Sequence, residues 1–177
     1  SKSHTGSLAP NDRVLEIAIK KSGAIKTRET REMFGLIEIL ELSNTHNYDG
    51  GFAILTNGGG VGVVTTDLCE DCGLNLAKPS EETEMKLKEI IPIEGSVNNP
   101  FDVLGDANQQ RYEKTLSILC ESNEYNNILV IFTPQKVVES KVLAETIFKY
   151  VKKYKNINIF TSFIGGEYIK AGADFLT

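Results

Sequence analysis

The sequence lacks the features that mark membrane-spanning, secreted and nucleic-acid-binding chains. No apolar stretch among its 177 residues approaches the length that a membrane-spanning helix needs. The N-terminus lacks the charged segment followed by an apolar one that is typical of a signal peptide. The net charge is −5, and no basic run is longer than Lys152-Lys153. Because nucleic acids and anionic membranes attract positive charge, we expect neither as a partner.

Cysteine is scarce as well. The chain has three cysteines, Cys69, Cys72 and Cys120, an odd number that does not indicate a disulfide framework. The spacing of Cys69 and Cys72 resembles half of a zinc site, but no second pair follows. We therefore expect no metal site and reduced thiols in a cytoplasmic protein. Two of these thiols should lie one helical turn apart, with at least one packed inside.

The first 45 residues predict the end of one domain, and the rest predict another. Residues 1–10 show no apolar periodicity and include a histidine, so we expect the chain to be a piece of a longer protein. Two short helices should follow, the second capped by Thr27. The polar, turn-rich stretch 43–51 indicates a boundary. We accordingly divide the chain into residues 1–45 and 46–177.

From residue 46 onward, short apolar runs alternate with helical segments. This alternation predicts an α/β fold with an open parallel sheet and helices on both faces. Ser80 should cap one helix, and Asp106 with Gln109 should form a capping box for another. Because the sequence stops after a helix, where such a fold should have one more strand, we expect truncation at the C-terminus. The predicted strands are 52–56, 74–77, 101–104, 128–132 and 157–163.

Three strand-to-helix turns are rich in glycine: 57–62, 105–107 and 164–167. In a parallel sheet such turns meet at the carboxyl edge, where the N–H groups and dipole of a starting helix favour phosphate. The alternative is that the glycines only permit tight turns and close packing. The spacing within 58–62 does not match a dinucleotide-binding motif. The candidate ligand-binding residues are Asn57, Gly58, Gly59, Gly60, Gly165 and Gly166, with Gly105, Asp106 and Ala107 as the phosphate candidates.

His4 lies in a small polar loop with no apolar face against which it could pack. Composition alone favours a solvated loop histidine. A functional role would require a neutral imidazole that acts as a nucleophile near a site for a transferred phosphoryl group. The N-terminus of a helix at the carboxyl edge is the element that suits such a group.

Several segments, in order along the chain, are similar to the NDP-forming acyl-CoA synthetases. This family contains the ADP-forming acetate–CoA ligases and is related to succinyl-CoA synthetase. The resemblance covers essentially the whole chain. Several motifs occur in the same order and register as in the family, which is hard to obtain by chance. The segments that carry it are Ser3-His4-Thr5-Gly6-Ser7-Leu8-Ala9, Gly23-Ala24-Ile25, Leu55 to Gly62, Leu76 to Glu82, Asn99 to Ala107, Ile131 to Gln135 and Ile164 to Glu167.

The resemblance implies a flavodoxin-like, succinyl-CoA synthetase-like fold, preceded by the tail of a second such domain. It also implies the reaction acyl-CoA + ADP + phosphate ⇌ acid + CoA + ATP, with His4 as the phosphoryl carrier. Ser3, Thr5 and Gly6 would support the histidine loop. The turn at Gly105-Asp106-Ala107 would hold the phosphoryl group at one of two helix N-termini.

The resemblance further implies partners outside this sequence. A CoA-binding Rossmann domain would lie upstream, and an ATP-grasp domain or subunit would bind ADP/ATP and Mg²⁺. We expect no cofactor on this chain alone, a small acyl-CoA as substrate, and an oligomeric parent enzyme in the cytoplasm. We also expect the isolated chain to be inactive as a ligase.

Two other functions remain open. Some protein acetyltransferases carry this assembly as an acetyl-CoA-sensing regulatory module, in which the loop histidine is typically replaced. The retained His4 favours the synthetase over that module. A flavodoxin-like binding module without catalysis is the third possibility, and burial of His4 away from every glycine turn would favour it.

Overall fold

The computed structural model describes residues 12–42, 49–74 and 76–176. The chain divides into two units, Ser1–Leu42 and Ser43–Thr177. In the first unit, α1 spans Asp12–Ser22. Gly23 follows with φ of 73°, a left-handed conformation that glycine adopts without strain. This glycine therefore marks the end of the helix.

The second helix of this unit, α2 (Thr30–Leu42), begins later than predicted. The Thr27 cap was wrong. The backbone N–H of Arg28 instead donates to Glu32 Oε2 at 2.6 Å, so a carboxylate in the first turn accepts from the chain that enters the helix. Both helices carry apolar side chains that are largely exposed, among them Val14, Ile17, Phe34 and Ile37.

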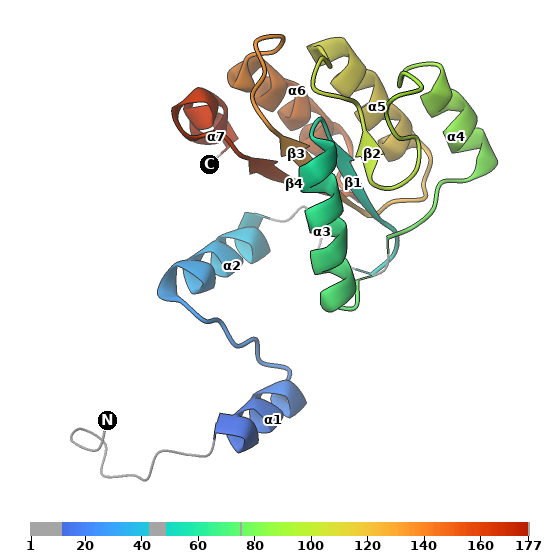
Figure 1. The fold of residues 1–177 in the computed structure, drawn as a ribbon. Helices are drawn as coiled ribbons and strands as arrows, with labels where there is room; N and C mark the ends of the chain where they lie inside the picture. The colour runs from blue at the N-terminus through green and yellow to red at the C-terminus, as the bar shows by residue number, and fades with distance from the viewer. Residues whose placement is uncertain (1–11, 43–48, 75, 177) are drawn as a thin grey trace. The chain divides into compact units, whose positions relative to one another are not determined.

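The second unit is built on four parallel strands in the order β2-β1-β3-β4, with helices in the connections (Figure 1). This order is that of a flavodoxin-like sheet. The predicted α/β fold with an open parallel sheet is thus confirmed. The strands are β1 (Phe52–Thr56), β2 (Phe101–Asp102), β3 (Asn127–Phe132) and β4 (Asn158–Phe163).

The predicted strand at 74–77 was wrong: among the residues described there, Leu76 forms an isolated bridge with Phe52 and none belongs to a strand. The edge of β1 on this side is occupied by the side chain of Asn99. Its Oδ1 accepts from the Ile54 N–H at 2.9 Å, and its Nδ2 donates to the Phe52 carbonyl at 2.7 Å. A side-chain amide thus satisfies backbone groups that a neighbouring strand would otherwise pair.

Helices cover both faces of the sheet (Figure 1). On one face lies α3, and on the other lie α4, α5 and α6. A short 3₁₀ helix, η1, and α7 follow β4, and α7 packs against α6. The bounds are α3 (Gly59–Asp71), α4 (Glu81–Lys88), α5 (Gln109–Glu121), α6 (Ser140–Lys153), η1 (Gly166–Ile169) and α7 (Lys170–Leu176).

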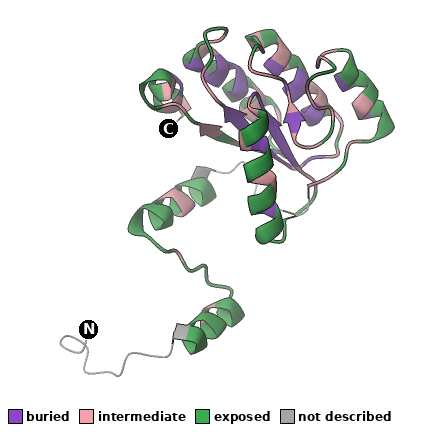
Figure 2. Cartoon of the chain, in the orientation of Figure 1, coloured by how far each residue is buried: buried purple, intermediate pink, exposed green. Residues whose placement is uncertain are grey.

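The alternation of side chains along β1 divides the core into two clusters. Ala53 and Leu55 join the larger cluster, which packs against α4, α5 and α6. Ile54 points to the other face, where it meets Cys69 of α3 and Ile131 of β3. Figure 2 shows the buried residues gathered on the strands and on the helix faces that turn toward them. Both faces of the sheet are therefore apolar, as a parallel sheet requires.

The predicted cap of α4 is confirmed: Ser80 Oγ accepts from the Thr83 N–H at 3.2 Å. The Glu124 carboxylate reinforces it by accepting from both the N–H and the hydroxyl of Ser80. Burial alone would raise the pKa of Glu124, but hydrogen bonds from Thr83 and Ser80 bring the pKa below its ordinary value. The loop before β3 is thereby tied to the start of α4.

All three cysteines are unpaired. Cys69 is buried and Cys72 is exposed one turn later, as the sequence predicts. Burial raises the pKa of Cys69 and of Cys120, the latter to about 12, so neither buried thiol ionises near neutral pH. None of the helices in the described part of the chain is long and apolar enough to cross a membrane.

Candidate functional site

The carboxyl ends of β1, β2 and β3 form the edge to which the sequence assigns most candidate residues. β1 leads through Asn57 and Gly58 into α3. β2 leads through the turn 103–108 into α5, and β3 leads through Thr133 toward α6. Because these strands are adjacent and parallel, their three turns lie side by side. Their hydrogen bonds determine which of them has groups left for a ligand.

Asn57 is a structural clamp in this site. The residue is only 4% exposed. Its Nδ2 donates to the Thr133 carbonyl at 2.8 Å, and its Oδ1 accepts from the Thr133 N–H at 2.9 Å and from the Thr133 hydroxyl at 3.0 Å. Asn57 therefore joins the ends of β1 and β3. Because both ends of its amide are bonded to Thr133, the Asn57 side chain positions the turn 57–59.

The turn from β1 into α3 leaves the start of the helix without a side-chain cap. Gly58 is the N-cap residue and has no side chain to offer. Its N–H is bonded to Thr56 Oγ1 at 3.0 Å, but that bond precedes the helix. At Gly60 a Cβ would meet no atom within 4 Å, so the space beside the first turn is open. The first N–H groups of α3 are thus without a side-chain cap, as are those of α6, whose N-cap residue is Glu139.

Asp102 ends β2 and connects two of the turns. Its Oδ1 accepts from the Leu104 N–H at 2.8 Å. Its Oδ2 lies against the first residue of α3, since a Cβ at Gly59 would be 2.8 Å from that atom. Burial and, next, the negative charge of Asp102 raise the pKa of Tyr112, whose hydroxyl donates to the Ile131 carbonyl.

The turn from β2 into α5 differs from its prediction. The capping box of Asp106 and Gln109 was wrong: the N-cap is Asn108, whose Oδ1 accepts from the Arg111 N–H at 2.9 Å. Asp106 instead forms an ion pair with Arg111 Nη1 at 2.6 Å. The hydrogen bond from Arg111 lowers the pKa of Asp106 below its ordinary value. Asn108 lies one turn before Arg111, the spacing at which a side-chain oxygen reaches a free helical N–H.

The three predicted phosphate residues therefore precede α5 and do not begin it. Ala107 is buried, and its N–H donates to the Leu104 carbonyl at 3.1 Å. Asp106 is exposed, and a Cβ at Gly105 would lie at ordinary contact distance from the Asn57 carbonyl and the amide of Gln135. This turn uses much of its hydrogen-bonding capacity internally, in contrast to the start of α3.

Gly165 and Gly166 belong to the end of β4, the strand beyond β3. A Cβ at Gly165 would lie 2.4 Å from Pro134 Cγ, so glycine is needed there for the two loops to pass closely. Gly166 has φ of 55° and open space around it. The structure thus brings this turn against the end of β3, whereas Asn57, Asp102 and Gly105 gather at β1 and β2.

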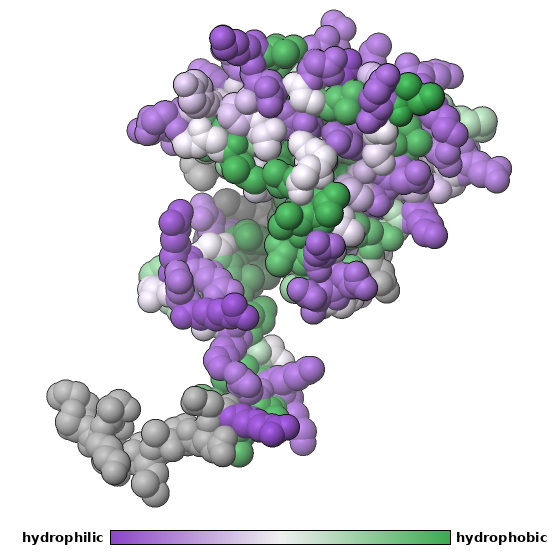
Figure 3. Space-filling model, viewed as in Figure 1, coloured by the Kyte–Doolittle hydropathy of each residue, from purple (hydrophilic) through white to green (hydrophobic). Residues whose placement is uncertain are grey.

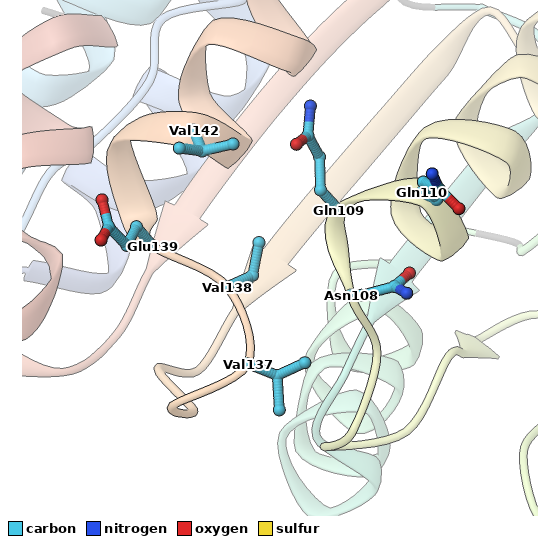
Figure 4. Close-up of a pocket in the computed structure, with 7 residues that line it drawn as sticks. All are labelled: Asn108, Gln109, Gln110, Val137, Val138, Glu139 and Val142. Carbon is cyan, nitrogen blue, oxygen red and sulfur yellow. The ribbon is translucent and has the colours of Figure 1, made fainter.

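A hollow of about 400 Å³ lies beside this edge and was not predicted from the sequence. Figure 4 shows its two sides, Asn108–Gln110 at the start of α5 and Val137–Val142 before and at the start of α6. Gln109 Nε2 donates to Thr146 Oγ1 of α6 at 2.9 Å. The mixed stretch 133–139, with Val137 and Val138 among polar residues, gave no clear signal, and only the topology shows that it faces α5.

His4 and its supporting residues Ser3, Thr5 and Gly6 lie outside the described residues. Among the residues that the structure does describe, no group of three or more histidine, cysteine, aspartate or glutamate side chains could hold a metal ion.

Figure 3 shows apolar side chains on the surface over α3, and among them Val63, Val64 and Leu68 are exposed.

Comparison with known proteins places the second unit in a family. The Ligase-CoA domain model matches residues 52–176. The chain is 37% identical to acetate–CoA ligase (ADP-forming) I of Archaeoglobus fulgidus, over 94% of this chain and 23% of the relative. It is 33% identical to the alpha subunit of acetate–CoA ligase (ADP-forming) I of Pyrococcus furiosus, over 98% of this chain and 37% of that subunit.

A solved structure agrees with these relatives. The dinucleotide-forming acetyl-coenzyme A synthetase 1 of Candidatus Korarchaeum cryptofilum, in complex with phosphate and ADP, matches with a TM-score of 0.89 and 28% identity. The match covers 99% of this chain and 38% of that one. The chain thus spans less than two fifths of each of these proteins. With the Ligase-CoA domain matched over most of its length, the chain belongs to the Ligase-CoA domain family.

Proposed function

We propose that this chain is the part of an ADP-forming acetate–CoA ligase that carries the phosphoryl group. The parent enzyme would interconvert acetyl-CoA or another small acyl-CoA, ADP and phosphate with the acid, CoA and ATP. The observation that carries this proposal is the Ligase-CoA domain match over residues 52–176, together with the histidine loop in the same chain.

His4 would act as the phosphoryl carrier. Inorganic phosphate attacks the thioester carbonyl, the C–S bond breaks, and an acyl phosphate and CoA result. A neutral imidazole nitrogen of His4 then attacks the phosphorus atom, which releases the carboxylate. ADP finally takes the phosphoryl group from the phosphohistidine, and ATP forms. Ser3, Thr5 and Gly6 would shape the loop that carries His4.

The carboxyl edge of the sheet would receive the phosphoryl group. The uncapped first turn of α3 offers N–H groups and the positive end of a helix dipole, which favour a phosphate. The turn Gly105-Asp106-Ala107 would form the neighbouring wall, with Gly105 close to the Asn57 carbonyl. We propose that these two turns together hold the group while it resides on His4.

The remaining machinery would lie outside this chain. We propose that residues 1–45 end a preceding succinyl-CoA synthetase-like domain, and that a CoA-binding Rossmann domain lies upstream. An ATP-grasp domain or subunit would bind ADP/ATP and Mg²⁺. The coverage of 23% to 38% of the relatives leaves room for these parts. On this basis the isolated chain would not complete turnover, and the parent enzyme would be a cytoplasmic oligomer.

The test is the formation of ATP by the parent enzyme from acetyl-CoA, ADP, phosphate and Mg²⁺. His4→Asn should abolish it, because the amide cannot accept a phosphoryl group reversibly. His46→Asn is the matched control, the same change at the only other histidine of the chain, and should retain activity. Undiminished ATP formation by His4→Asn would contradict the proposal.

A further inference from the structure

The backbone of Asp102 is held from two sides. Its N–H donates to the Ser96 carbonyl at 3.1 Å, and its carbonyl accepts from the Ser96 N–H at 3.0 Å. On its other side it pairs with Thr56 of β1. The Asp102 side chain therefore projects from a fixed point of the sheet, at the end of the short strand β2.

The two carboxylate oxygens of Asp102 face two different turns. Oδ1 accepts from the Leu104 N–H at 2.8 Å, within the turn that leads to α5. Oδ2 lies so close to the start of α3 that a Cβ at Gly59 would be 2.8 Å away. Glycine at this position leaves room for the carboxylate.

Leu104 holds an unusual backbone conformation, with φ of 69°. A leucine in the left-handed region is strained and persists only where its surroundings hold it there. Asp102 fixes the Leu104 N–H, and the Leu104 carbonyl accepts from the Ala107 N–H at 3.1 Å. The direction of the chain through Gly105 is thus determined by a strained residue that Asp102 helps to hold.

We propose that Asp102 is a positioning residue for phosphoryl transfer, acting through the Leu104 turn. It keeps the turn 103–107 in a fixed relation to the first turn of α3, and these are the two walls between which the phosphoryl group would reside. The inference rests on the proposed function for the presence of that group. It assigns to Asp102 no direct contact with phosphate and no proton transfer.

Two substitutions in the parent enzyme separate the roles of the carboxylate. Asp102→Asn keeps an oxygen that can accept from the Leu104 N–H but removes the charge. Asp102→Ala removes the acceptor as well. Leu104→Gly allows the left-handed conformation without strain, so in the Asp102→Ala background it should restore the turn. Each variant is measured for kcat, for the KM of phosphate and of acetyl-CoA, and for thermal unfolding.

We expect Asp102→Ala to lower kcat by roughly tenfold to a hundredfold, the range for a misplaced catalytic geometry, with the KM of acetyl-CoA unchanged. Asp102→Asn should stay close to the wild type. Adding Leu104→Gly to Asp102→Ala should recover most of the lost kcat. Should Asp102→Ala alone fail to fold, the double variant remains the informative protein and should be folded and active.

Three results would overturn the inference. Wild-type kcat in folded Asp102→Ala would show that the turn does not need this residue. An equal loss in Asp102→Asn and Asp102→Ala would assign the effect to the charge. A double variant that recovers nothing would show that Asp102 does not act through Leu104. If instead the wild-type parent forms no ATP at all, the proposed function fails, which is distinct from each of these outcomes.

Discussion

The two turns that lie beside the Asp102 carboxylate both contain glycine, but they differ in whether a side chain caps the helix that follows. The turn 57–59 enters α3 without a side-chain cap, and its Asn57 side chain bonds to Thr133, the residue that follows β3. The turn 103–108 enters α5 with the cap of Asn108 and the ion pair of Asp106 with Arg111. Glycine content therefore does not distinguish an open anion site from a closed turn. The partners of the N–H groups do.

The largest effect on stability is expected from Asn57→Ala, which removes the clamp between β1 and β3. The change leaves the N–H and carbonyl of Thr133 without their partner, so it should lower the free energy of unfolding by roughly 2–3 kcal/mol. Urea unfolding of the chain followed by circular dichroism measures this.

Thr133→Val is the matched control for that clamp, because it removes only the hydroxyl bond to Asn57. Its cost should be about 1 kcal/mol. An equal loss of unfolding free energy in the two variants would mean that the backbone bonds of Thr133 to Asn57 contribute nothing to stability. Asn57 would then not be the clamp that the structure indicates.

A smaller effect is expected at the capped turn. Asn108→Ala removes the acceptor of the Arg111 N–H and should cost about 1 kcal/mol, as typical N-caps do. Asn108→Asp retains an acceptor oxygen and adds a charge that the helix dipole favours, so it should match the wild type. If Asn108→Ala unfolds at the wild-type urea concentration, α5 is not capped by this side chain.

The smallest effect is expected from Asp106→Asn. The ion pair with Arg111 is solvent-exposed on the aspartate side, and exposed pairs contribute little. Because Arg111 lowers the folded-state pKa of Asp106, the contribution is present above the unfolded-state value, about 3.9, and is lost as the pH falls through the folded-state pKa. The free energy of unfolding of the wild type should therefore exceed that of Asp106→Asn slightly at pH 7, and the difference should shrink as the pH falls below about 3.9.

ATP formation by the parent enzyme should survive Asp106→Asn, because the Asn108 cap and the Leu104 turn remain. Near-complete loss of activity would show that the Asp106 carboxylate does more than pair with Arg111. The turn 103–108, and not only the start of α3, would then take part in the chemistry.

The strands were predicted well from the sequence where a continuous apolar run marks them. The runs 52–56 and 128–132 are continuous and apolar, and they became the two central strands. The segment 74–77 is shorter and is interrupted by Asn75, and at the sheet edge the side chain of Asn99 bonds to β1. A side chain that replaces a strand leaves no periodic signal, so this could not be predicted.

The site was predicted less completely, for a related reason. The carboxyl edge followed from topology, and the glycine turns marked it. Which turn stays open depends on hydrogen bonds between distant residues, such as Asn57 with Thr133 and Asp102 with Leu104. Asp106 and Asn108 are both good caps, and only the three-dimensional path of the turn decided that Asn108 takes that place.

The most direct test of the account is phosphoryl labelling of the parent enzyme with γ-labelled ATP and Mg²⁺, comparing the wild type with His4→Asn and His46→Asn. The account predicts a label that is stable in base and lost in acid, as expected of a phosphohistidine, in the wild type and in His46→Asn. It predicts none in His4→Asn. An equal label in His4→Asn, or an active wild-type enzyme that never becomes labelled, would contradict the central claim that this chain carries the phosphoryl group on His4.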